Sequence, residues 1–158
     1  ALLLTRQNLP IFDRKVLASA ENLKQGAYTI WENSAACHDI IIMASGSEVW
    51  VSLEAGKRLA QEGKKVRVVS FPSWELFEQQ DDAYKVSVFP AECHARLAVE
   101  AGCSIGGEKF VGREGKIIGI DHFGASAPGA ILAEKFGITV ENVYKQARSL
   151  IALWSPGY

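Results

Sequence analysis

The turn Ser45-Gly46-Ser47 is the first segment whose residue types suggest ligand binding. It follows an apolar run and precedes a helical pattern, and free backbone N–H groups at a helix N-terminus can bind an anion. Open α/β sheets also bind ligands at the carboxyl ends of their strands. The chain contains neither Gly-x-Gly-x-x-Gly nor Gly-x-x-x-x-Gly-Lys-Ser/Thr. Ser45, Gly46 and Ser47 therefore fit an anion site, but use as a simple turn and helix cap is the commoner outcome.

Arg6 is the strongest single candidate for phosphate binding. Its guanidinium is a planar fork that meets a phosphate with two parallel hydrogen bonds. It follows the short apolar run of residues 2–4, and an arginine at such a place is most often an ordinary surface residue. The residue type alone therefore does not assign Arg6 to a site.

Asp121, His122 and Ser126 combine the side-chain types of a hydrolase triad. Such a triad needs the serine on a sharp turn, usually Gly-x-Ser-x-Gly, and a histidine delivered from elsewhere in the fold. Ala125-Ser126-Ala127 lacks the flanking glycines. We expect a structural segment in which Ser126 caps a helix opened by Pro128.

The cysteines and histidines do not form a metal-binding pattern. Cys37-His38 and Cys93-His94 are adjacent pairs, and neighbouring side chains on a strand point apart, whereas tetrahedral zinc needs four converging ligands. Cys103 completes an odd number of cysteines without the spacing of a disulfide framework. We expect no metal site, and we expect the reducing environment of the cytoplasm.

The composition excludes several classes of protein. The chain has 158 residues, 48% apolar and 22% charged, which is typical of one globular domain. A net charge of −1 and a pI near 6.4 give no basic excess for nucleic acid. The longest apolar runs, such as Ile40–Ala44, are too short to span a bilayer, and no signal peptide opens the chain. Ala1-Leu2-Leu3-Leu4 is similar to the end of a strand whose start is missing, so we expect a fragment.

The alternation of apolar runs and helical patterns predicts a three-layer α/β/α, doubly wound domain with a mostly parallel sheet of about five strands. The expected strands are 28–31, 39–44, 66–71, 96–100 and 116–121. The expected helices are 48–62, a short one through 74–77, 81–88, 128–136 and one that begins after residue 139. Ser47, Ser73 and Thr139 are the expected N-caps.

Two motifs near opposite ends of the chain indicate a family. Asp121–Pro128 is similar to the signature loop of the C-terminal domain of transketolase, and Thr5–Pro10 resembles the segment by which that family leaves its pyrimidine-binding domain. Thr5 stands where serine is usual and keeps the hydroxyl. Further similar segments extend the resemblance over nearly the whole chain, namely Val66–Phe77, Arg96–Gly102 and Phe136–Val143.

The resemblance implies a division of the chain and a role for one residue. Residues 1–10 would be the tail of the preceding pyrimidine-binding domain, 11–25 an interdomain linker, and 26–158 the transketolase C-terminal domain. Arg6 would hold the phosphate of the sugar substrate. No catalytic, cofactor-binding or metal-binding residue is implied for this chain, because those residues belong to the family's two preceding domains.

The resemblance also implies the reaction of the parent enzyme. A transketolase is a homodimer that reversibly transfers a two-carbon ketol unit from a ketose phosphate to an aldose phosphate, in the pentose phosphate pathway or the Calvin cycle. Thiamine diphosphate, anchored by Mg²⁺ or Ca²⁺, supplies the carbanion chemistry. The domain itself would be structural, would support the dimer and would be inactive alone, with neither nucleic acid nor membrane as a partner. A stand-alone anion- or nucleotide-binding regulatory module is the alternative.

Overall fold

The computed structural model describes residues 5, 7–35 and 37–154. It contains one five-stranded sheet with the strand order β1-β3-β2-β4-β5. The strands are β1 (Tyr28–Glu32), β2 (Ile40–Ala44), β3 (Val66–Ser70), β4 (Arg96–Val99) and β5 (Lys116–Ile118). Only β1 runs antiparallel to its neighbour, and it lies at the edge of the sheet. The predicted fold class is confirmed.

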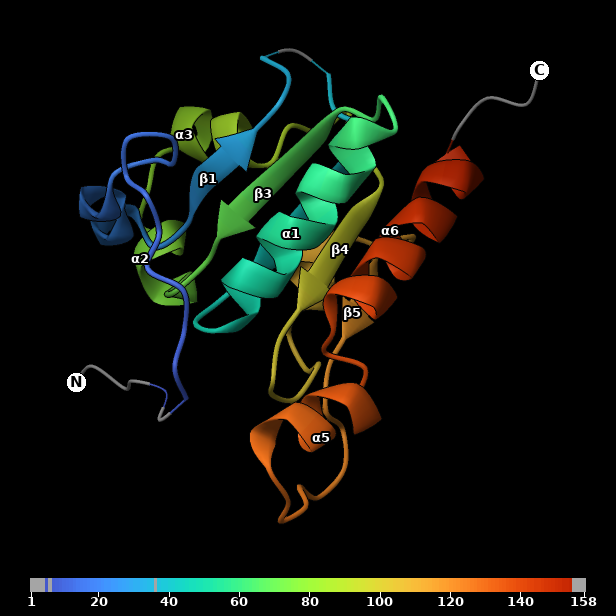
Figure 1. The fold of residues 1–158 in the computed structure, drawn as a ribbon. Helices are drawn as coiled ribbons and strands as arrows, with labels where there is room; N and C mark the ends of the chain where they lie inside the picture. Colours follow the sequence, from blue (N-terminus) through green and yellow to red (C-terminus); the bar gives the residue numbers. More distant parts are fainter. Residues whose placement is uncertain (1–4, 6, 36, 155–158) are drawn as a thin grey trace.

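Helices cover both faces of the sheet, as Figure 1 shows. The longer ones are α1 (Glu48–Gln61) and α6 (Val140–Trp154), and the shorter ones are η1 (Ala20–Gln25, a 3₁₀ helix), α2 (Trp74–Glu78), α3 (Asp82–Val88), α4 (Glu108–Val111) and α5 (Gly129–Lys135). The helices α1 and α6 pack side by side on one face. The short helices α2, α3 and α4 lie on the other face, where their aromatic side chains join Phe71 and Phe89 in a second core.

The central strand β2 explains why the sheet forms a core on both sides. All five of its residues are buried, and they alternate between the two faces. Ile40 and Ile42 belong to the core beneath α1 and α6, whereas Ile41 and Met43 pack with the aromatic residues on the opposite face. An uninterrupted apolar run is what a parallel strand covered on both faces requires.

Several local predictions need correction. Helix α5 starts at Gly129, and Pro128 rather than Ser126 is its N-cap residue, without a side-chain capping bond. Ser47 occupies the N-cap position of α1, but its hydroxyl makes no capping bond, since its backbone is helical (φ −66°, ψ −28°) rather than extended as in a capping residue. The helix α4 was not predicted, since four residues are too few to show helical periodicity. The caps at Ser73 and Thr139 are confirmed by hydrogen bonds from Leu76 N–H and Asn142 N–H.

Candidate functional site

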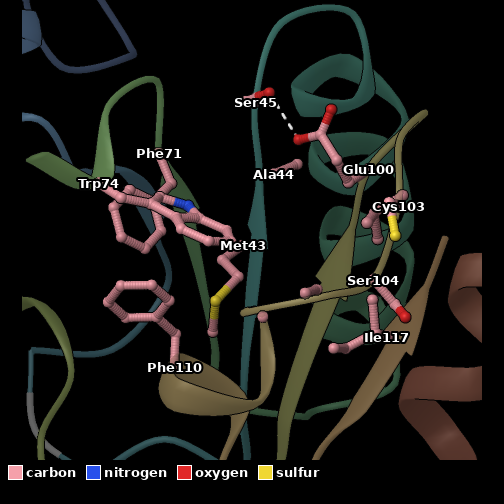
Figure 2. A pocket seen from close by; sticks show the side chains of 13 residues that line it. Met43, Ala44, Ser45, Phe71, Trp74, Glu100, Cys103, Ser104, Phe110 and Ile117 are labelled. Atoms are coloured by element: carbon pink, nitrogen blue, oxygen red, sulfur yellow. Dashed lines mark hydrogen bonds between the residues drawn. The ribbon is translucent and has the colours of Figure 1, made fainter.

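A crevice lies where β2, β3 and β4 end at the same edge of the sheet. It is an open hollow in which the centre of a water molecule could occupy about 40 Å³, and Figure 2 shows it from close by. Carboxyl ends of parallel strands are where open α/β sheets bind ligands, so this is the candidate site. Its lining consists of Met43, Ala44, Ser45, Phe71, Trp74, Ala98, Val99, Glu100, Cys103, Ser104, Gly107, Phe110 and Ile117.

Three aromatic rings form one wall of the crevice. The ring centroids of Phe71 and Phe110 lie 4.6 Å apart, and those of Trp74 and Phe110 lie 5.2 Å apart. Phe71 and Phe110 are buried, whereas Trp74 is 42% exposed. Trp74 is the first residue of α2, whose start is fixed by the capping bond from Leu76 N–H to the hydroxyl of Ser73. The wall therefore offers an accessible indole supported by two buried rings.

The opposite wall is polar, and Glu100 is its only ionisable carboxyl group. The hydroxyl of Ser45 donates a 2.6 Å hydrogen bond to Oε2 of Glu100, which joins the ends of β2 and β4 (Figure 2). Just outside the crevice, the hydroxyl of Ser47 donates to Oε1 of Glu48 over 2.7 Å. Burial raises the pKa of Glu48; the Ser47 hydroxyl and the Glu48 backbone N–H counteract this, and the nearby Glu100 carboxylate adds to it.

The structure places the predicted anion site beside these two carboxylates. Ser45, Gly46 and Ser47 form the turn that leads into α1, as the sequence indicated. The hydroxyls of Ser45 and Ser47 donate to Glu100 and Glu48 and so are already engaged. Two carboxylates repel an anion, so the surroundings weigh against the anion site, which stays a prediction.

Arg6, the predicted phosphate ligand, lies outside the described residues. Its neighbours Thr5 and Gln7 are exposed, and the backbone N–H of Gln7 donates a 3.4 Å hydrogen bond to the hydroxyl of Thr5. The role of Arg6 therefore stays a prediction based on the motif alone.

Asp121, His122 and Ser126 do not form a hydrogen-bonded triad within the described part of the chain. Both carboxylate oxygens of Asp121 accept from Ser104, one from its backbone N–H at 2.8 Å and one from its hydroxyl at 2.9 Å. These bonds lower the pKa of Asp121. Nδ1 of His122 lies 2.8 Å from the carbonyl oxygen of Phe123. The carboxylate of Asp121 therefore ties its loop to the segment that follows β4, in agreement with a structural role.

The cysteines do not contribute to a metal-binding cluster among the described residues. Cys37, Cys93 and Cys103 are all free, and Cys93 is buried while the other two are exposed. Among the described residues, no group of three or more His, Cys, Asp or Glu side chains is placed to hold a metal ion. In the same residues, no helix is both long and apolar enough to cross a membrane.

Comparison with known proteins assigns the chain to a family. Residues 26–139 match the family described as "Transketolase-like TK C-terminal domain". The chain belongs to the transketolase family. It is 47% identical to a transketolase of Staphylococcus epidermidis over 150 residues, which are 95% of this chain and 22% of that protein.

Solved transketolases have the same fold over this region. The chain matches a transketolase from Leishmania mexicana with a TM-score of 0.79 and 41% identity, over 89% of this chain and 20% of that one. It matches a transketolase from Pichia stipitis, in complex with sedoheptulose 7-phosphate, with a TM-score of 0.82 and 35% identity, over 94% and 21% of the two chains. This chain thus spans about a fifth of the length of the transketolases it matches.

Neither Glu100 nor the aromatic wall was predicted as part of a site. Glu100 follows β4 just as Ser45 follows β2, so its position at the carboxyl end of a predicted strand was the available signal. Trp74 and Phe110 belong to different helices, α2 and α4, and only the fold shows that they border one open crevice.

Proposed function

We propose that this chain serves as the C-terminal domain of a thiamine-dependent transketolase, which transfers a two-carbon ketol unit from a ketose phosphate to an aldose phosphate. Two observations support this proposal. Residues 26–139 match the family's C-terminal domain, and the chain covers only 22% of the length of a whole transketolase. In this proposal residues 1–10 end the pyrimidine-binding domain, 11–25 are the linker, and 26–158 form the C-terminal domain.

Arg6 is the residue of this chain that we assign to the substrate. The supporting observation is the motif Thr5–Pro10. In this motif Arg6 stands at the position of the arginine with which the family binds the sugar phosphate. A related transketolase has been solved in complex with sedoheptulose 7-phosphate, a phosphorylated ketose. A bidentate guanidinium contact would fix the phosphate end of such a substrate.

Thiamine diphosphate does not fit the turn Ser45–Ser47 beside the crevice. A diphosphate requires donors or a cation, whereas Ser45 and Ser47 donate to the carboxylates of Glu100 and Glu48. No cluster of metal-ligating side chains lies within the described residues. We therefore assign thiamine diphosphate and its Mg²⁺ or Ca²⁺ to other domains of the parent enzyme, and we expect this chain to be inactive alone.

The contribution of this domain is mainly structural, by supporting a homodimer. The side chain of Phe123 is 99% exposed, and every residue from 121 to 131 is exposed. In this proposal the partner copy covers the large apolar side chains of this segment, Phe123 and the 55% exposed Ile131. The partners in this proposal are the other domains, a second copy of the enzyme and sugar phosphates. The three free cysteines support a cytoplasmic location.

The intact mass of the gene product in its native source tests the proposal. A mass several times the 17.2 kDa of this chain is expected, because the chain covers only about a fifth of its relatives. Calorimetry of the 158-residue chain with thiamine diphosphate and Mg²⁺ should give no binding heat. A native product near 17 kDa, or cofactor binding by the chain alone, would contradict the proposal.

A further inference from the structure

The crevice at the ends of β2, β3 and β4 carries a negative charge that nothing in its lining neutralises. Glu100 is the one ionisable carboxyl group among the lining residues, and no Lys, Arg or His is among them. Neither Glu100 nor Glu48 takes part in an ion pair between described residues. Asp121 adds a further carboxylate close by, through its bonds to Ser104 at the rim. The crevice is therefore suited to a positively charged ligand.

Glu100 keeps one oxygen for such a ligand. Oε2 accepts the hydrogen bond from Ser45, and Oε1 has no hydrogen-bond partner among the described residues. A charged N–H donor bound to a carboxylate makes a shorter and stronger hydrogen bond than a neutral donor does. The polar wall can thus hold one cationic group at the mouth of the crevice.

The aromatic wall of the crevice favours a ligand with a flat, apolar ring. Trp74, Phe71 and Phe110 stand opposite Glu100 across the hollow, with Met43 between the walls in Figure 2. Aromatic rings bury apolar surface favourably, and the electron-rich face of a ring also attracts cations. The indole of Trp74 remains 42% exposed, so part of this surface is accessible to a ligand.

We infer that the crevice binds a small planar organic cation, such as an aryl amidinium or aryl guanidinium, whose ring lies against Trp74 and whose N–H groups pair with Glu100. This ligand class carries the opposite charge to the anion predicted for the adjoining turn. The inference does not depend on the proposed transferase function, since it rests on the lining residues of the crevice alone.

The inferred binding of a planar cation can be tested on the 158-residue chain with three probes of similar ring size and different charge. Benzamidine is a planar cation, benzyl alcohol is neutral and benzoate is an anion. In an NMR titration followed at the indole N–H of Trp74, identified by its loss in Trp74→Phe, benzamidine should bind with a Kd on the order of 1 mM. Benzyl alcohol should bind about tenfold more weakly, and benzoate should not bind.

A variant without the carboxylate charge distinguishes the contribution of Glu100 to binding from that of the aromatic wall. Glu100→Gln keeps the size of the side chain and an oxygen that can accept from Ser45. In this variant the affinity for benzamidine should fall about tenfold, to that of benzyl alcohol, while binding of benzyl alcohol stays the same. Glu114→Gln is the matched control, because Glu114 is exposed and does not line the crevice; it should change neither affinity.

Two exposed thiols give an independent readout in the unaltered chain, should Glu100→Gln fail to fold. Cys103 lines the crevice, whereas Cys37 precedes the other end of β2. Bound benzamidine should slow the alkylation of Cys103 by iodoacetamide and leave that of Cys37 unchanged. Benzoate that binds as tightly as benzamidine, equal affinities of Glu100→Gln and the unaltered chain for benzamidine, or equal slowing of both cysteines would overturn the inference.

Discussion

Gly26 and Gly63 both have a positive φ angle but lie in different surroundings. Their φ angles are +81° and +79°, in the left-handed region that glycine adopts at no steric cost. A Cβ atom on Gly26 would lie 2.2 Å from the backbone nitrogen of Phe77 and 2.4 Å from the carbonyl oxygen of Ser73, whereas on Gly63 it would meet nothing within 4 Å. Gly26 thus sets how closely η1 approaches α2, the helix that carries Trp74.

Replacing each of these two glycines by alanine should lower the free energy of unfolding by different amounts. Gly63→Ala should lower the free energy of unfolding by about 1 kcal/mol, the usual cost of a left-handed non-glycine residue. Gly26→Ala should lower it by more than about 3 kcal/mol, because backbone atoms of α2 must also move. Urea unfolding of both variants measures the difference. Equal losses would show that the approach of η1 to α2 contributes nothing to stability.

The buried thiol of Cys93 predicts a loss of stability at alkaline pH. Burial raises the pKa of Cys93 from the usual 9.0 to about 11, although the guanidinium groups of Arg96 and Arg67 counteract the shift. When the pKa of a group is higher in the folded state than in the unfolded state, its contribution to the free energy of unfolding is fully present below the unfolded-state pKa. This contribution is lost as the pH rises toward the folded-state pKa. Between about pH 9 and 11 the free energy of unfolding should therefore fall by about 2 kcal/mol more in the unaltered chain than in Cys93→Ala. Parallel pH profiles of the two proteins would contradict this.

The exposed ring of Phe123 predicts a defect in assembly without a defect in folding. In the parent enzyme, Phe123→Ser should raise the dimer dissociation constant about tenfold or more, because it removes an apolar anchor from the contact. The unfolding curve of the 158-residue chain should not change, since the side chain is 99% exposed. Analytical ultracentrifugation across a dilution series measures the dissociation constant.

Val86→Ser is the matched control for Phe123. Val86 is also an exposed apolar residue, at 55%, but it lies on α3 and outside the proposed contact. It should leave the dissociation constant unchanged. A dimer of the Phe123→Ser enzyme as tight as that of Val86→Ser would show that the segment 121–131 is not part of the dimer contact.

Arg6 predicts a specific kinetic defect in the parent enzyme. Arg6→Ala should raise KM for phosphorylated sugars about 30-fold, since losing one charge-assisted contact costs on the order of 2 kcal/mol. Arg113→Ala, which removes an exposed arginine from the loop before β5, is the control and should leave KM unchanged. Steady-state kinetics with several phosphorylated ketoses and aldoses provide the measurement. An unchanged KM for all of them would rule out the assignment.

The elements of the fold could be predicted where a strong local pattern decides the structure. The apolar run Ile40–Ala44 predicted a strand covered on both faces, and all its residues are buried. The expected helix 48–62 agrees with α1, which ends at Gln61, within one residue. The helix α4 was missed because its four residues are held by a distant contact, the packing of Phe110 against Phe71.

The candidate site was less predictable, because its defining contacts join distant parts of the chain. Ser45 and Glu100 are 55 residues apart, so no local pattern shows that the serine hydroxyl donates to that carboxylate. The same limit applies to Trp74, whose ring faces Glu100 only once β3 and β4 take their places in the sheet. The sequence could indicate the edge of the sheet where ligands bind, but not the charge of the crevice at that edge.

The most direct test of the central claim is a ketol-transfer assay on the intact gene product. Supplied with thiamine diphosphate and Mg²⁺, the full-length protein should transfer a two-carbon unit from a ketose phosphate such as sedoheptulose 7-phosphate to an aldose phosphate acceptor. The 158-residue chain should show no transfer under the same conditions. A full-length protein without this activity, or a 158-residue chain that has it, would contradict the account.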